Sequence, residues 1–249
     1  MTTRFSFQLY SARNHLPLEN TLKTLADLGF AEVEGFGGVY DEPAKLRGEM
    51  DKLGLTMPSG HVSLDMMEKD RKKVLSIART LGMNKLVIPF LMPDQRPKSA
   101  KGWKDFGKRL EVVSRTYRAE GFGVAWHNHD FEYVPLKDGS TPHELMFANA
   151  PTLDWEIDVA WIVRGKSNPL KWIKTYAGAI TLAHVKDIAE KGRNVEEEGW
   201  ADVGHGVVKW QAIMDALKQT RCMHYVLEHD KPSDVTRFAK RSIAAAKKY

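Results

Sequence analysis

The chain has 249 residues, of which 43% are hydrophobic and 28% are charged, with a formal net charge of +5 and a pI of about 9.1. This size and balance suit one α/β barrel with enough apolar material for a core. No apolar run approaches the roughly 20 residues that span a bilayer, so we expect no membrane association. Lys and Arg residues are scattered along the chain rather than gathered in a stripe with aromatics, which predicts a solvated surface and no nucleic-acid partner.

The N-terminal segment MTTRFSFQLYSARNHL has no charged leader followed by an apolar stretch, so we expect no signal peptide in it. A cytoplasmic protein is the resulting expectation, with a periplasmic location left open because a removed signal leaves no trace. The single cysteine, Cys222, excludes an internal disulfide and a cysteine-rich zinc site. Any metal site must therefore use His, Asp and Glu.

Short β-rich runs alternate with amphipathic runs along the whole chain. Taken in chain order, the expected strands cover residues 5–9, 31–36, 55–61, 84–89, 122–129, 153–158, 180–186 and 223–228. Each is followed by a helix, expected at residues 18–28, 43–53, 66–81, 101–119, 142–148, 169–176, 208–218 and from 233 to the end. Glycines at 29, 54, 82 and 121 mark helix ends.

Strict alternation predicts parallel strands, because each helix is then a crossover connection. Eight such units close into a single (β/α)₈ TIM barrel, here one domain spanning residues 1–249. A doubly wound open sheet is the alternative, but it more often has a glycine-rich phosphate loop after its first strand. The segment QLYSARNHL contains no glycine, which favours the barrel.

Ionisable residues gather where the expected strands end, which is the rim that carries the active site in barrel enzymes. These residues are Glu34, His61, His127, His129, Asp130, Asp158, His184, Lys186, Asp187, Glu228 and Asp230, with Glu132 just beyond the fifth strand. Ionisable groups in a half-buried rim cost several kcal/mol unless they are paired, hydrogen-bonded or bound to a metal. A His/Asp/Glu set without thiols suits Mn²⁺, Mg²⁺, Co²⁺ or Zn²⁺.

Each of these residues also has a structural interpretation. A lone strand-end histidine such as His61 is more often simply hydrogen-bonded. Asp158 could cap a turn, and Lys186 with Asp187 could form a surface ion pair of little energetic value. Trp161 could be a packed aromatic or a stacking surface for a sugar. The functional interpretation depends on the coincidence of the whole set on one rim.

Several motifs occur together in a recognisable order. They are QLYSAR (8–13), LGFAEVEGFGG (28–38), GHVSL (60–64), WHNHDFEY (126–133), IDVAWIVRG (157–165), AHVKD (183–187), DVGHGVVKW (202–210) and VLEHD (226–230). This set resembles the xylose isomerase-like TIM barrels, the superfamily that also holds ketose 3-epimerases, inosose dehydratases and the zinc endonucleases of abasic sites (AP endonuclease family 2). Within it, the pattern is similar to bacterial proteins labelled sugar phosphate isomerase/epimerase.

The resemblance implies a divalent metal at the ends of strands five to eight. Asp158, His184 and Glu228 occupy three of the usual ligand positions. The usual glutamate of the fifth strand is replaced by His127, which the resemblance then makes the fourth ligand. His129 has the same strand parity as His127, so which of the two faces the metal stays open.

Because an imidazole replaces that carboxylate, the acid/base pair of the ketose epimerases does not carry over directly. We expect proton transfer to involve a set of candidate catalytic residues, namely Glu228, Lys186, Glu132 and Glu34. The candidate substrate contacts are His61, His129, Arg193 and Trp161.

The function expected from these residues is that of a divalent-metal-dependent isomerase or epimerase, which abstracts a proton from a ketose or keto-polyol to form a metal-stabilised ene-diolate. A lyase of the same fold, acting by keto-inositol dehydration or 3-keto-glycoside elimination, is one alternative. A non-catalytic sugar-binding barrel is another, and a phosphodiesterase would need more histidines and carboxylates than we can place. The expected partner is a small sugar or polyol, and homo-oligomer formation stays open.

Overall fold

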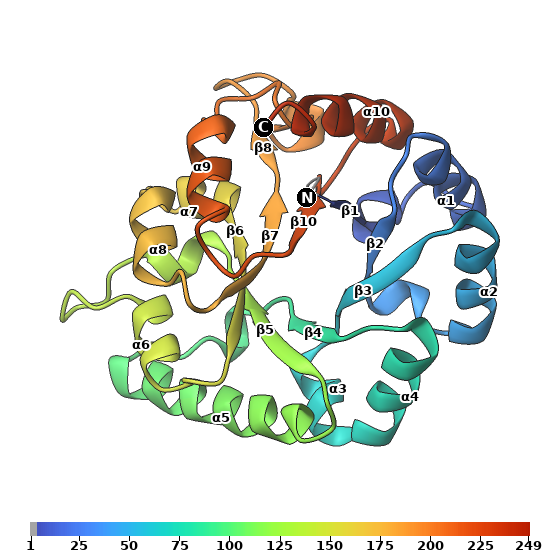
Figure 1. Ribbon diagram of the computed structural model, residues 1–249. Coiled ribbons are helices and arrows are strands. Elements are labelled where there is room, and N and C mark those ends of the chain that lie inside the picture. The colour runs from blue at the N-terminus through green and yellow to red at the C-terminus, as the bar shows by residue number, and fades with distance from the viewer. Residues whose placement is uncertain (1–3) are drawn as a thin grey trace.

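The computed structural model describes residues 4–249; residues 1–3, the start of the segment assessed for a signal peptide, lie outside the described part. Its centre is a closed barrel of parallel strands in the order β1-β10-β7-β6-β5-β4-β3-β2. Helices surround this barrel on the outside (Figure 1). The (β/α)₈ TIM barrel expected from the sequence is confirmed.

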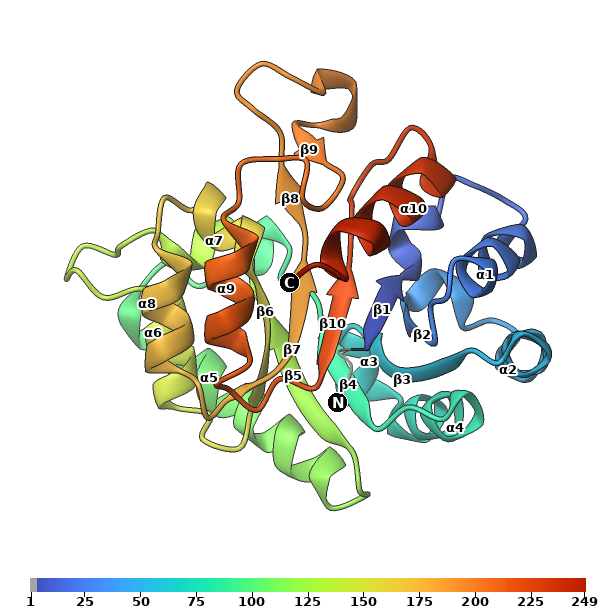
Figure 2. The same cartoon turned by 45° about the horizontal axis from the view of Figure 1, so that its top comes forward.

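The barrel strands are short and mostly buried. They are β1 (Phe5–Gln8), β2 (Glu32–Gly35), β3 (Thr56–His61), β4 (Lys85–Ile88), β5 (Gly123–His127), β6 (Asp154–Asp158), β7 (Ile180–Val185) and β10 (His224–Leu227). A separate antiparallel pair, β8 (Asp187–Ile188) and β9 (Trp200–Ala201), interrupts the long segment after β7. Figure 2 shows this pair beyond the end of β7, on the side of the barrel where β1 and β10 also end.

The outer layer consists of α1 (Leu18–Asp27), α2 (Pro43–Leu53), α3 (Leu64–Lys69), α4 (Arg71–Leu81), α5 (Ala100–Arg118), α6 (Pro142–Ala148), α7 (Val159–Arg164), α8 (Pro169–Thr175), α9 (Trp210–Leu217) and α10 (Val235–Ala246). Short 3-10 turns are η1 (Leu9–Ala12), η2 (Gly37–Val39), η3 (Pro93–Gln95), η4 (Asp130–Tyr133) and η5 (Val195–Glu197). None of the helices formed by residues 4–249 has the length and apolar character to cross a membrane.

Two helical predictions need correction. The single helix expected at residues 66–81 is divided into α3 and α4, because Asp70 leaves helical geometry and its side chain accepts a hydrogen bond from the Lys73 N–H at the start of α4. The local pattern does not predict α7, which begins directly after β6. There the Asp158 Oδ1 accepts a hydrogen bond from the Trp161 N–H at 2.8 Å and caps the helix.

The fifth strand ends two residues earlier than expected. β5 stops at His127 because the next residue, Asn128, turns its side chain onto β6 instead of continuing the strand. Its amide nitrogen donates to the Asp158 carbonyl at 3.0 Å, and its amide oxygen accepts from the Asp158 N–H at 2.8 Å and from Trp155 Nε1 at 2.9 Å. Asn128 therefore fixes the end of β5 against the end of β6.

The interior of the barrel has an apolar layer beneath a polar one. Val87, Ala125 and Leu182 form a buried cluster of their own, apart from the main core between barrel and helices. Alternate residues of a strand point to opposite faces, so Ala125 and Leu182 share a face with His127 and His184, two residues further along. The histidines at the strand ends thus lie above a small hydrophobic layer inside the barrel.

Candidate metal centre and active site

Four side chains from neighbouring strands meet at the carboxyl-terminal end of the barrel. They are His127 at the end of β5, Asp158 at the end of β6, His184 in β7 and Glu228 directly after β10. One ligand atom from each lies within 4.8 Å of those of the other three. Each of the four residues is buried. His184 Nδ1 is 2.9 Å from Glu228 Oε2, and His127 Nε2 is 4.0 Å from Asp158 Oδ2. We call these four residues the rim group.

A second set of ligand-type atoms lies directly beside the rim group and shares two of its members. It consists of His61, His127, Glu156 and His184. Glu156 was not among the candidate site residues, although a signal for it existed: it shares a face of β6 with Asp158 two residues later. We call this second set the inner group.

Glu34 extends the inner group from the opposite side of the barrel. Its Oε1 is 2.7 Å from His184 Nε2 and 3.2 Å from His61 Nε2. Gln8 Nε2 donates to the same oxygen at 2.8 Å, and the Ser59 hydroxyl donates to Glu34 Oε2. The carboxylate of Glu34 therefore accepts from Gln8 and Ser59 and also faces two imidazole nitrogens.

Lys186 brings a fully buried ammonium group to the edge of the rim group. Its Nζ is 2.6 Å from Asp230 Oδ1 and 3.2 Å from Glu228 Oε2, and it lies 4.2 Å from the centre of the Trp200 ring. Burial opposes its charge, but Asp230, Glu228 and Asp158 together raise the pKa of Lys186 above its usual value. Lys186 is thus a cation at neutral pH, and its carboxylate partners lie beyond β10 rather than at Asp187.

Asp187 anchors the long segment after β7. Its carboxylate accepts hydrogen bonds from the N–H groups of Gly204 at 2.9 Å, Gly206 at 3.2 Å and Val208 at 3.1 Å, and from Trp210 Nε1 at 3.2 Å. The Asp187 side chain is therefore occupied by the loop that returns to α9. Its role is to hold that loop against the barrel.

The histidines and carboxylates of the two groups shift one another's protonation. Burial works against charge on His61, yet Glu156 and Glu34 raise the pKa of His61 to about 9. Burial likewise opposes charge on Glu156, but His184 and His61 hold the pKa of Glu156 well below its usual value. Burial and the neighbouring His184 lower the pKa of His127 to about 4, and burial raises the pKa of Asp158 to about 7. Strong coupling of this kind is common at functional sites.

The donor set fits a divalent cation. Asp158 Oδ1 caps α7, whereas Asp158 Oδ2 is buried and has no hydrogen-bond donor among residues 4–249. A buried carboxylate oxygen without a partner costs free energy that a bound cation can offset. Two imidazoles and two carboxylates suit Zn²⁺, Co²⁺ or Mn²⁺. Of the two histidines at and just after the end of β5 considered as ligands, His127 belongs to both groups and His129 to neither.

Glu132 lies outside both groups. Its Oε2 accepts from Trp126 Nε1 at 2.9 Å and its Oε1 accepts from the His129 N–H at 2.9 Å. Burial raises the pKa of Glu132 to about 8, and His143 Nδ1 is 3.6 Å away. The structure therefore places this candidate catalytic residue beneath the turn that follows β5, where it holds the turn in place.

Aromatic rings continue the site towards solvent. The His129 ring lies 4.7 Å from the Phe90 ring and 5.0 Å from the Trp161 ring, and Trp161 lies 4.9 Å from Trp200. His129 and Trp161 are half-buried, so both can present a face to a bound molecule. Arg193 is exposed on the loop between β8 and β9, and it contacts neither group within the described part of the chain.

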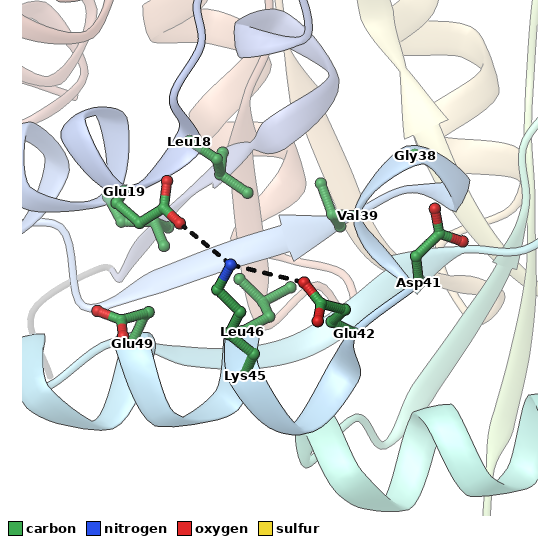
Figure 3. Close-up of a pocket in the computed structure, with 10 residues that line it drawn as sticks. Leu18, Glu19, Gly38, Val39, Asp41, Glu42, Lys45, Leu46 and Glu49 are labelled. Atoms are coloured by element: carbon green, nitrogen blue, oxygen red, sulfur yellow. Dashed lines mark ion pairs between the residues drawn. The ribbon is translucent and has the colours of Figure 1, made fainter.

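A hollow elsewhere on the surface is separate from this site. Figure 3 shows it between α1 and α2, where Lys45 Nζ lies 3.5 Å from Glu42 and 3.9 Å from Glu19. It belongs to the outer helical layer and shares no residue with the rim or inner group. Both groups of ligand-type atoms found in the described residues lie inside the barrel rim.

Comparison with known proteins agrees with this architecture. The family described as xylose isomerase-like TIM barrel matches residues 22–249, whereas no curated protein matches the sequence significantly.

Three solved structures illustrate the likeness of fold. A sugar phosphate isomerase/epimerase from Parabacteroides distasonis superimposes with a TM-score of 0.82 at 21% identity, covering 99% of this chain and 94% of its own. The probable 3-DHS dehydratase AsbF from Bacillus anthracis gives 0.75 at 14% identity, with 98% of each chain covered. The IOLI protein with a bound zinc atom gives 0.74 at 16% identity, covering 99% of this chain and 96% of its own.

Proposed function

The chain belongs to the xylose isomerase-like TIM barrel family, and from that premise we propose that it is a divalent-metal-dependent isomerase or epimerase of a ketose or keto-polyol. The observation that carries the proposal is the convergence of the rim group from four neighbouring strands, with a buried Asp158 oxygen that lacks a donor in residues 4–249. His127, Asp158, His184 and Glu228 would hold the ion. When bound, a divalent ion polarises the carbonyl and the adjacent hydroxyl of a keto sugar.

Glu228 is the proposed base. It is 4% exposed, and its contacts with His184 and Lys186 both use Oε2, so Oε1 has no hydrogen-bond partner among the residues described; Glu34 is fully buried and accepts from Gln8 on one oxygen and from Ser59 on the other. A carboxylate with donors on both oxygens has neither oxygen free to receive a proton from a substrate. Glu228 is thus the better placed of the two carboxylates to remove the proton next to a substrate carbonyl.

Lys186 is the proposed stabiliser of the negative charge that develops on the substrate oxygen. Its ammonium group lies 3.2 Å from Glu228, so it faces the point where the proton is removed. Because its pKa is raised, Lys186 acts as a positive charge and hydrogen-bond donor and not as a base. His129 and Trp161 would form the wall against which the apolar face of a sugar stacks.

A lyase is the second candidate, favoured by one feature of the site. Epimerisation needs proton carriers on two faces of the substrate, whereas elimination needs one base and an acid for the leaving group. The strand-end position that the family usually fills with a glutamate is His127 here, and two cationic groups, Lys186 and His61, lie nearby. This composition suits removal of water or a glycosyl group next to a ketone.

Proton exchange in D₂O tests the proposal. Candidate ketoses, keto-inositols and 3-keto-glycosides would be incubated with Mn²⁺-, Co²⁺-, Mg²⁺- or Zn²⁺-loaded protein and analysed by NMR for deuterium at the α-carbon. Exchange with a new epimer supports the isomerase, and exchange with release of water or an aglycone supports the lyase. Glu228→Gln should abolish exchange, while Glu190→Gln, an exposed carboxylate, should not change it. Tight binding with no exchange in any metal form would overturn the enzyme assignment in favour of a sugar-binding barrel.

A further inference from the structure

One carboxylate oxygen contacts three histidine rings at once. Glu156 Oε2 lies 2.8 Å from His61 Nε2, 3.0 Å from His127 Nδ1 and 3.1 Å from His184 Nε2. Glu156 is fully buried, and its other oxygen has no hydrogen-bond partner among the residues described. A carboxylate oxygen is an acceptor only, so each of these nitrogens is matched to it when it carries a proton.

The neighbouring Glu34 also presents an acceptor oxygen to His184. The Gln8 amide is oriented by the Tyr10 N–H, which donates to Gln8 Oε1 at 3.0 Å, so Gln8 Nε2 must face Glu34 Oε1. The Ser59 hydroxyl donates to the other oxygen of Glu34. Glu34 Oε1 is thus used as an acceptor, and His184 Nε2, 2.7 Å from it, is matched to it when that nitrogen carries a proton.

These contacts select which nitrogen of each ring is free. A neutral imidazole has one N–H and one lone pair. With Nδ1–H on His127 and Nε2–H on His184, the lone pairs fall on His127 Nε2 and His184 Nδ1. Those are the nitrogens that face Asp158 Oδ2 at 4.0 Å and Glu228 Oε2 at 2.9 Å. The lone pairs are thus directed towards the rim group.

We propose that Glu156, supported by Glu34, is a positioning residue that fixes the ring orientation and the tautomer of both metal-site histidines. The inference rests on the metal centre of the proposed function. Hydrogen-bonded carboxylates behind ligating histidines orient the rings and raise their basicity, and their loss costs metal affinity. The alternative is that the inner group holds a second cation, which would require lone pairs on the nitrogens that face Glu156. The two arrangements exclude each other, so the proposal predicts one ion per chain.

Glu156→Gln is the direct test. With its oxygen in the place of Glu156 Oε2, the neutral amide is a weaker acceptor for all three rings than a carboxylate, and with the amide flipped its NH₂ group would confront their N–H groups. We expect Zn²⁺ affinity, measured by competition with a chromophoric chelator, to fall 10- to 100-fold. Asp154→Asn is the matched control, because Asp154 is a buried carboxylate on the same strand that pairs with Lys85 and Arg118 at the opposite end of the barrel. Its Zn²⁺ affinity should equal that of the wild type.

Two measurements on the wild type keep the proposal falsifiable if Glu156→Gln does not fold. Metal analysis should give one Zn²⁺ per chain, and long-range ¹H–¹⁵N NMR of the zinc-loaded protein should show Nδ1–H on His127 and Nε2–H on His184. Two Zn²⁺ per chain, the opposite tautomers, or unchanged affinity in a folded Glu156→Gln would overturn the positioning role alone. A wild type that binds no divalent metal would overturn the metal centre itself.

Discussion

Glu132 offers a sharp test of how a buried carboxyl group makes stability depend on pH. It is fully buried, and burial raises its pKa to about 8 from a reference value of 4.5. The folded protein therefore holds a proton on Glu132 at pH values where the unfolded chain has lost it. Below pH 4.5 the group is protonated in both states and imposes no penalty. As the pH rises from 4.5 to 8, folding requires proton uptake, so the free energy of unfolding falls.

The size of the effect follows from the shift. One pH unit within this window changes the free energy of unfolding by about 1.4 kcal/mol. Between pH 5 and pH 7.5 the contribution of Glu132 should therefore decline by about 3 kcal/mol. Glu132→Gln has no ionisable group and keeps one acceptor oxygen for Trp126 or the His129 N–H. At every pH the free energy of unfolding of the variant should be about 1 kcal/mol lower because one acceptor is missing. Its free energy of unfolding should not fall between pH 5 and pH 7.5 through this group.

Urea unfolding followed by circular dichroism, at several pH values between 5 and 7.5 with EDTA present, measures the difference between wild type and variant. The difference should shift by about 3 kcal/mol in favour of Glu132→Gln as the pH rises, whereas Glu190→Gln should run parallel to the wild type. Parallel curves for wild type and Glu132→Gln would refute the reasoning. Glu132→Gln should also retain proton-exchange activity, because Glu132 supports the turn after β5. Complete loss of exchange in a folded variant would make Glu132 a catalytic candidate again.

Other perturbations probe the remaining features. His184→Ala should abolish metal binding and leave the far-ultraviolet circular dichroism unchanged; an unaltered metal content by elemental analysis would contradict the rim group as the metal site. Chelation should lower the thermal midpoint only modestly, since occupancy at 100 times Kd adds about 2.7 kcal/mol, and differential scanning fluorimetry with and without EDTA checks this. Asp187→Ala should lower the free energy of unfolding in urea by about 3 kcal/mol or more, because several N–H groups lose their acceptor. Trp161→Ala should raise KM about 2- to 10-fold at constant kcat in steady-state assays, because the substrate loses one stacking contact.

Much of the architecture could be predicted because local signals and the barrel topology agree. The helices at Pro43–Leu53 and Pro142–Ala148 begin at a proline and have the predicted bounds. The differences arise where a side chain, rather than periodicity, sets the boundary. Asp70 divides one amphipathic run into two helices, and Asn128 ends β5 by bonding to a residue 30 positions away. A long-range bond of that kind leaves no trace in the local pattern.

The same distinction applies to the site. The residues of the rim group are among the strand-end residues of the sequence, because parallel strands of a closed barrel must end at one rim, and the family resemblance singles out the four. Glu156 lies one pleat deeper in β6 than Asp158, so the strand-end criterion does not select it although it shares the face of Asp158. Glu132 lies just beyond the expected end of the fifth strand, yet its side chain turns back beneath the turn onto Trp126 and the His129 N–H. Only coordinates show which side of a turn a carboxylate occupies.

The direct junction between β6 and α7 restricts how this barrel could be given a new specificity. Asp158 ends the strand and caps the helix with the same side chain, so no residue can be inserted between it and Trp161 without dissolving the helix start. Grafting of foreign loops would have to spare residues 154–164. The segment 89–99 and the loop between β8 and β9, which carry the exposed side chains of Phe90 and Arg193, are the places where contacts to substrate could be exchanged while the residues of the rim group are kept.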